Sequence, residues 1–114
     1  MPYANVARCC GTCPFRADIT QFYVPTDVLD ATVGENLRNG YAHNCHRTSN
    51  ARHPMVCAGF LRFTRRERIH NPMVELATRL DLMGPVDETA PLIAGGWADV
   101  LNEHHRRAGL LDGE

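Results

Sequence analysis

The stretch Cys10-Gly11-Thr12-Cys13-Pro14 opens a set of four cysteines that continues with Cys45 and Cys57. The spacing is C-x2-C-x31-C-x11-C, and a close pair joined by two downstream thiols is typical of chains that enclose a soft metal. The 114-residue chain has only four Phe, three Tyr and one Trp, so its apolar core is thin. The sequence therefore predicts that thiolates converge on one metal centre and hold the loops in place.

Two kinds of metal centre fit these cysteines. An iron–sulfur cluster accepts ligands from scattered loops, and a proline after a cluster cysteine, as in Cys13-Pro14, recurs in ferredoxin-like sequences. Structural zinc more often uses two Cys-x-x-Cys pairs, but four thiolates, or three thiolates and an imidazole, would also hold it. We expect a [4Fe-4S] cluster, with one Zn²⁺ as the alternative. The predicted ligands are Cys10, Cys13, Cys45 and Cys57, with His43 and His46 as substitutes or as hydrogen-bond donors to sulfur.

Five cysteines leave one thiol over, and we assign Cys9 as the spare because adjacent cysteines seldom both reach one centre. Buried cysteines can also act as small hydrophobic side chains. That reading would explain Cys45 and Cys57 but not three cysteines crowded into one polar turn. A thiol oxidoreductase using Cys10 and Cys13 is a third reading, although no strand pattern precedes the pair.

Composition excludes several classes of protein. The formal net charge is −1, so bulk charge gives no footprint for nucleic acid or membrane. No stretch approaches the roughly 18 apolar residues of a membrane span, and the first residues lack the pattern of a signal peptide. We expect a cytoplasmic protein, where clustered cysteines more often bind metal than form stable disulfides. No catalytic motif is present, which favours a protein that is not an enzyme.

The hydrophobic pattern predicts a small, mainly α single domain over residues 1–114, with about four helices and irregular cysteine-bearing loops. The first helix is expected over about 27–38, with Thr26 as N-cap and Gly34 or Gly40 at its end. The second runs from Pro54 to about His70. Its predicted buried face carries Val56, Cys57, Phe60, Leu61, Phe63 and Thr64.

Two more helices are predicted in the C-terminal half. Asn71-Pro72 is a cap followed by a first-turn proline, and the helix it opens should stop at Gly84. One side of it carries Val74, Ala77 and Leu80. The last helix is expected over about 97–108, and His104 and His105 are interpreted as surface residues. Its predicted inward residues are Trp97, Val100 and Leu101, and its predicted outward residues are Glu103, Arg106 and Arg107.

A basic face is expected on the second helix, formed by Arg62, Arg65 and Arg66. Such a face could bind nucleic acid phosphates or a partner protein. The alternative, a solvated face balanced by nearby carboxylates, is preferred.

Three motifs resemble a family of small uncharacterised proteins from actinobacteria and their bacteriophages. They are Cys10-Gly11-Thr12-Cys13-Pro14-Phe15-Arg16, Cys45-His46-Arg47-Thr48 and Val56-Cys57-Ala58-Gly59-Phe60-Leu61. The resemblance covers about residues 9–63, and the helical part at about 64–108 adds nothing specific to it. It implies that the four predicted ligands are the family's shared cysteines. The implied companions are Arg16, His46 and Gly59.

The Cys-x-x-Cys-Pro stretch also resembles WhiB-like iron–sulfur regulators, whose last cysteine follows much sooner than Cys45 does here. We therefore expect a redox- or oxygen-responsive accessory or regulatory protein. Its partner would be a regulatory protein or, for a bacteriophage protein, a protein of the host. The alternatives are a zinc-stabilised module that binds nucleic acid or protein, and the thiol oxidoreductase.

Overall fold

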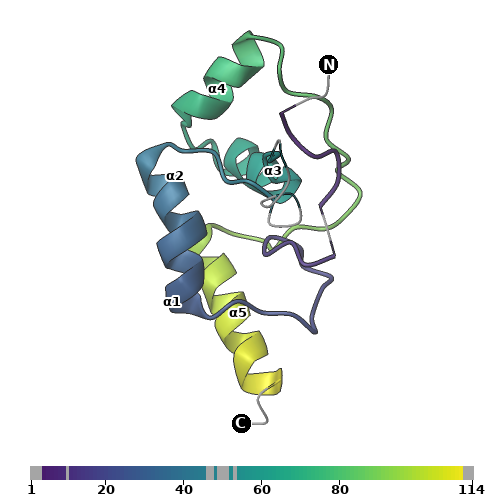
Figure 1. Cartoon of the computed structure of the whole chain (residues 1–114). Coiled ribbons are helices and arrows are strands. Elements are labelled where there is room, and N and C mark those ends of the chain that lie inside the picture. Colours follow the sequence, from purple (N-terminus) through teal and green to yellow (C-terminus); the bar gives the residue numbers. More distant parts are fainter. Residues whose placement is uncertain (1–3, 10, 46–47, 49–51, 53, 112–114) are drawn as a thin grey trace.

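Helices carry the regular structure of the chain in the computed structural model (Figure 1). The structure describes residues 4–9, 11–45, 48, 52 and 54–111. Within these ranges there are four helical segments and three isolated β-bridges, and no strand. The prediction of a small, mainly α domain of about four helices is confirmed.

The first helical segment is continuous from Thr26 to Asn39 and contains a wide π-turn in its middle. It ends at Gly40, whose φ of +75° is the left-handed conformation that glycine adopts without strain. Gly34 lies inside the segment. The predicted cap at Thr26 is wrong, because Pro25 is the N-cap and its carbonyl already accepts a bond from the Leu29 N–H. The parts of this segment are α1 (Thr26–Leu29), η1 (Asp30–Gly34) and α2 (Glu35–Asn39).

Helix α3 (Ala58–Glu67) is shorter than predicted at both ends. Before it, Val56 is extended and pairs on two sides: its N–H donates to the Ala4 carbonyl at 2.7 Å, and the Cys57 N–H donates to the His43 carbonyl at 2.8 Å. This backbone pairing holds residues 55–57 out of the helix. At the other end Arg68 is left-handed, with φ 55°, and stops the helix before His70.

Helix α4 (Pro72–Arg79) begins as predicted, with Asn71 Oδ1 accepting a hydrogen bond from the Val74 N–H at 3.1 Å. It ends before Gly84. Only Val74 of its predicted apolar side is buried, and Leu80 is 60% exposed. The prediction of an apolar side along Val74, Ala77 and Leu80 is therefore wrong for most of the helix. The reason is that α4 lies at the edge of the molecule, where only Val74 is buried (Figure 1).

Helix α5 (Trp97–Leu111) packs beside α1 and completes the core. The indole Nε1–H of Trp97 donates to Asp30 Oδ1 at 2.8 Å, which joins the start of α5 to the π-turn. The Phe15 ring lies at the centre of the aromatic residues, 5.0 Å from Phe63 and 6.2 Å from Trp97 between ring centroids. The loop that follows Cys13 is therefore part of the core.

The six residues predicted to form the buried face of the second helix are all buried, although Val56 and Cys57 precede α3. Among the described residues, no helix combines the length and the apolar character needed to cross a membrane.

Candidate metal centre

Cys13 and Cys57 come together although 44 residues separate them in sequence. Their sulfur atoms lie 3.9 Å apart, and both side chains are buried. Cys57 is the N-cap of α3, so the pair lies at the N-terminal end of that helix.

Gly59 makes this approach of Cys13 possible. A Cβ at Gly59 would collide with the Cys13 sulfur and would lie 3.1 Å from the Phe15 Cβ. The N-terminal loop therefore rests directly on the backbone of the first turn of α3. Gly59 of the sequence motif therefore has a steric reason.

The backbone of Cys45 pairs with the segment that precedes Cys57. Its N–H donates to the Met55 carbonyl at 2.7 Å, so the segment that ends at Cys45 runs beside the segment that leads to Cys57. Thr48 closes a turn after it, with its N–H 2.9 Å from the Cys45 carbonyl. The Cys45 side chain is 4% exposed.

Two predicted ligands, Cys10 and His46, lie outside the described residues. Within the described part of the chain, no three His, Cys, Asp or Glu side chains are grouped so that they could hold one metal ion. Of the predicted ligands that the structure describes, Cys13 and Cys57 are the two whose sulfur atoms lie close together. His43 hydrogen-bonds through Nδ1 to the Asn36 side chain at 3.0 Å.

Cys9, which sequence reasoning set aside, is buried beside Cys13 and hydrogen-bonded to it. Its sulfur also accepts a hydrogen bond from Arg62 Nη1 at 3.6 Å. The sequence offered no indication of this contact. Cys9 is next to the predicted ligand Cys10, and that position indicated only that the two cysteines do not both bind one metal.

The thiol contacts stabilise the neutral form of these cysteines. The pKa of Cys13 is raised, first because its thiol hydrogen-bonds with Cys57 and then because it is buried, and the bond from Cys9 offsets only part of this. The pKa of Cys9 is raised by its bond to Cys13 and by burial, against a lowering effect of Arg62. A metal ion binding here would therefore displace protons from sulfur.

His104 of α5 fixes the loop that carries Cys13. Its Nε2–H donates to the Pro14 carbonyl at 2.8 Å, and its Nδ1 accepts from the Val24 N–H at 3.0 Å. These two bonds specify the neutral imidazole, and burial lowers the pKa of His104. The prediction of a surface residue is wrong, since the side chain is fully buried.

Arg107, one turn further along α5, is also fully buried, and its predicted outward position is wrong. Its guanidinium donates to the Arg16 carbonyl at 3.0 Å, the Phe22 carbonyl at 3.2 Å and Glu103 Oε2 at 2.8 Å. The spacing Val100, His104, Arg107 is i, i+4, i+7, which is one helix face. This spacing with Val100 indicates that His104 and Arg107 face inward. The prediction was wrong because polar side chains were assigned to the surface.

The three arginines of the predicted partner face have different surroundings. Arg62 Nη1 donates to the Ala90 carbonyl at 2.6 Å, and Arg66 pairs with Glu67 at 2.9 Å and lies over the Phe63 ring. Only Arg65 extends without such a contact in the described part of the chain. Arg66 also donates to the Gly95 carbonyl, so Arg62 and Arg66 both bind the loop at 88–95 to α3.

Comparison with known proteins identifies the family. A model of a family of unknown function, DUF6283, matches residues 5–107, and the chain belongs to this family. No curated protein matches the chain, and no solved structure matches it either.

Proposed function

We propose that this protein is a small metal-centre protein, in which thiolates from the N-terminal loop, the 45–57 region and the start of α3 bind one inorganic centre. The observation that carries the proposal is the 3.9 Å separation of the Cys13 and Cys57 sulfurs. The proposed ligands are Cys10, Cys13, Cys45 and Cys57. The resemblance of these positions to the cysteine-motif proteins of actinobacteria and bacteriophages supports the same set.

The sulfur separation supports a single zinc ion. Two thiolates bound to one tetrahedral ion by bonds of about 2.3 Å lie about 3.8 Å apart, close to the separation of the Cys13–Cys57 pair. Zinc would join the loops to α3 and stabilise a surface for a protein or nucleic acid partner.

A [4Fe-4S] cluster is the second candidate, supported by Pro14 after Cys13 and by ligands drawn from three segments. The likeness to WhiB-like proteins supports a redox- or oxygen-responsive role for such a cluster. Residues of the aromatic core, Phe60 and Phe63, are fully buried behind Cys57 and would keep water from one side of it.

Anaerobic purification followed by analysis of zinc, iron and acid-labile sulfide tests the proposal. Zinc without colour supports the first candidate. Broad absorbance near about 400 nm, lost on exposure to air, supports the cluster. A folded protein that contains neither metal would overturn both.

The variants Cys45→Ser and Cys9→Ser test the ligand set. We expect Cys45→Ser to lose metal and to melt at lower temperature, because one thiolate is gone from the centre. Cys9→Ser is the matched control, since it removes a buried thiol that the proposal does not count as a ligand. Unchanged metal content in Cys45→Ser would contradict the assignment.

A further inference from the structure

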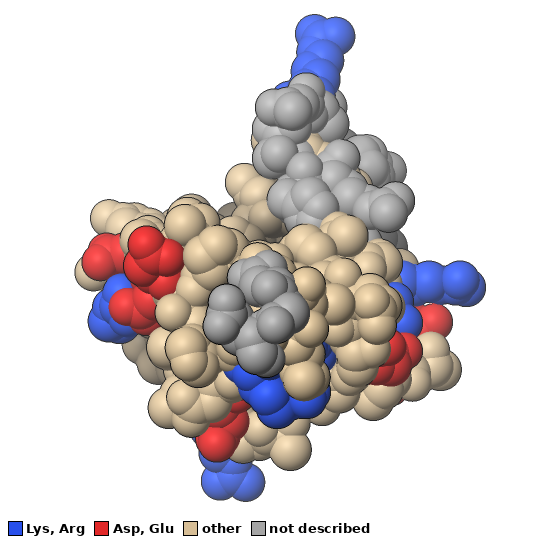
Figure 2. Space-filling model, turned by 90° about the horizontal axis from the view of Figure 1, so that it is seen from below, with Lys and Arg blue, Asp and Glu red and all other residues tan. Residues whose placement is uncertain are grey.

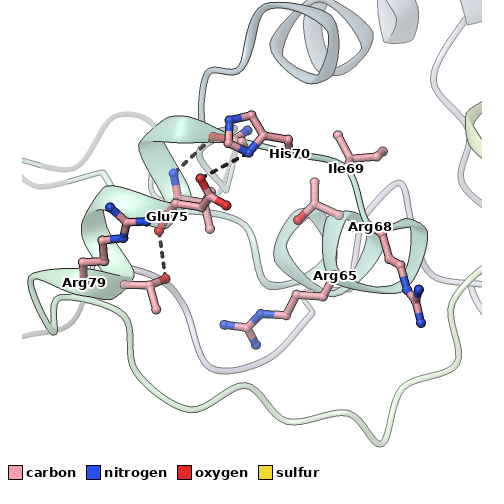
Figure 3. Close-up of a pocket in the computed structure, with 10 residues that line it drawn as sticks. Arg65, Arg68, Ile69, His70, Glu75 and Arg79 are labelled. Atoms are coloured by element: carbon pink, nitrogen blue, oxygen red, sulfur yellow. Dashed lines mark hydrogen bonds and ion pairs between the residues drawn. The ribbon is translucent and has the colours of Figure 1, made fainter.

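A second site lies at the opposite end of α3 from the cysteines. The C-terminal half of α3 and the length of α4 line an open cavity of about 580 Å³ on the surface (Figure 3). This volume falls within the range of pockets that hold small organic molecules. Its lining residues include Arg65, Arg68, Ile69, Val74 and Arg79.

Three arginines belong to the lining of this cavity, and their side chains have no partner in the part of the chain that the structure describes. Arg65, Arg68 and Arg79 make no side-chain hydrogen bond or ion pair with any residue that the structure describes. By contrast, Arg16 and Arg38 are each bound to a carboxylate. The cavity is thus a locally positive place on a chain whose formal net charge is −1.

The other polar groups of the cavity are already satisfied. Asn71 caps α4 and donates to the Tyr41 carbonyl, and the Thr78 hydroxyl donates to the Val74 carbonyl. The only carboxylate in the lining, Glu75, lies 3.2 Å from the His70 ring (Figure 3). The guanidinium groups are therefore the donors left for a ligand.

Arginine suits one class of ligand in particular. Its planar fork donates two parallel hydrogen bonds to phosphate, and its charge persists at every physiological pH. Ile69 and Val74 add apolar surface between the two helices. Figure 3 shows Arg65 extending from α3 towards the side of the cavity formed by α4.

We propose that the cavity between α3 and α4 binds a small organic phosphate, with Arg65 and Arg79 as donors to the phosphate groups and the apolar side chains against the organic part. The site does not depend on the metal centre. Arg65 lies eight residues after Cys57, about 12 Å along the helix.

Isothermal titration of the purified full-length protein with ADP and with inorganic pyrophosphate tests this proposal at low ionic strength. We expect saturable binding of both, with ADP binding more tightly because its organic part meets the apolar surface. Arg65→Gln and Arg79→Gln should each weaken ADP binding about tenfold, since each removes a charge-assisted hydrogen bond. Arg106→Gln removes the same charge from the exposed side of α5 and should change the affinity less than about twofold.

Three results would overturn the proposal: no saturable binding of either probe, equal weakening by Arg106→Gln, or binding of a single-stranded oligonucleotide but not of ADP. A second measurement on the unmodified protein is independent of variant folding. Amide NMR shifts induced by ADP should concentrate in residues 64–79, and shifts concentrated elsewhere would contradict the site.

Discussion

Gly59 shows at the scale of one residue how the sequence motif becomes a packed site. A helix normally gains stability when glycine is replaced by alanine, yet this position in the first turn of α3 has the Cys13 sulfur directly above it. The Cys13 sulfur occupies the space that a side chain at position 59 would need. Steric demand here outweighs helix propensity.

Gly59→Ala is therefore expected to destabilise the protein by about 1–3 kcal/mol, the usual cost of overpacking. Gly109→Ala is the matched control, because Gly109 also lies in a helix and a Cβ there would meet nothing within 4 Å. The control should gain about 0.5–1 kcal/mol. Urea denaturation measures both, and equal stabilisation by the two variants would contradict the packing of Cys13 on α3.

His104 is a second single residue that affects stability, through the protonation of its ring. The groups that bear on its ring are the Pro14 carbonyl, Glu103 and Arg107, and burial has the largest effect on its pKa. Because the pKa is lowered below 6.5 in the folded protein, protons bind the unfolded chain preferentially. This contribution to the free energy of unfolding is complete above pH 6.5 and decreases as the pH falls below that value.

His104→Gln should flatten the dependence of the unfolding free energy on pH below about 6.5, since the titrating group is gone. His105→Gln, on the exposed side of α5, is the control for replacing an imidazole in the same helix. Denaturation series at several pH values provide the measurement. An unchanged slope in His104→Gln would show that another group causes the dependence.

At the scale of the element, α5 acts on the cysteine loop through its buried polar residues. His104 and Arg107 together bind the backbone at Pro14, Arg16, Phe22 and Val24. Backbone groups of an irregular loop need such partners when they are buried. The C-terminal helix therefore determines the conformation of a loop some 90 residues earlier in the chain.

Arg107→Met is expected to cost about 3–5 kcal/mol, because two partly buried carbonyls and Glu103 lose their fully buried partner. Arg106→Met provides the comparison, since Arg106 pairs with the same carboxylate from the exposed side and should cost less than about 1 kcal/mol. Thermal melting of both variants is the measurement. Similar losses of stability in the two variants would contradict a larger contribution from the buried arginine, Arg107.

Local signals predicted the elements well, and non-local contacts caused the errors. The Asn71-Pro72 start of α4 depends on a cap bond within one turn, so sequence alone located it. The start of α3 was misplaced because residues 55–57 pair with segments far away in the chain. For the site, the cysteine spacing singled out Cys13 and Cys57, but nothing local could reveal that Cys9 lies against Cys13. The helical spacing of His104 with Val100 indicated an inward position, and its polar side chain argued against it.

At the scale of the whole molecule, irregular segments and short helices share one thin core. Segments 4–6, 43–45 and 55–57 pair through single bridges, and longer ladders are absent from the described ranges. On the face shown in Figure 2, acidic and basic side chains are interspersed among uncharged ones, so this face presents no extended surface of one sign to a polyanion. A metal centre would supply the cross-link that such an arrangement lacks.

The metal content of the unmodified protein and of the double variant Cys13→Ser/Cys57→Ser tests the central claim most directly. The account predicts about one zinc, or about four irons with sulfide, per unmodified chain. In the double variant the metal should fall below about a tenth of that amount, because both sulfurs of the pair are removed. Equal metal content in the two proteins, or none in either, would contradict the account.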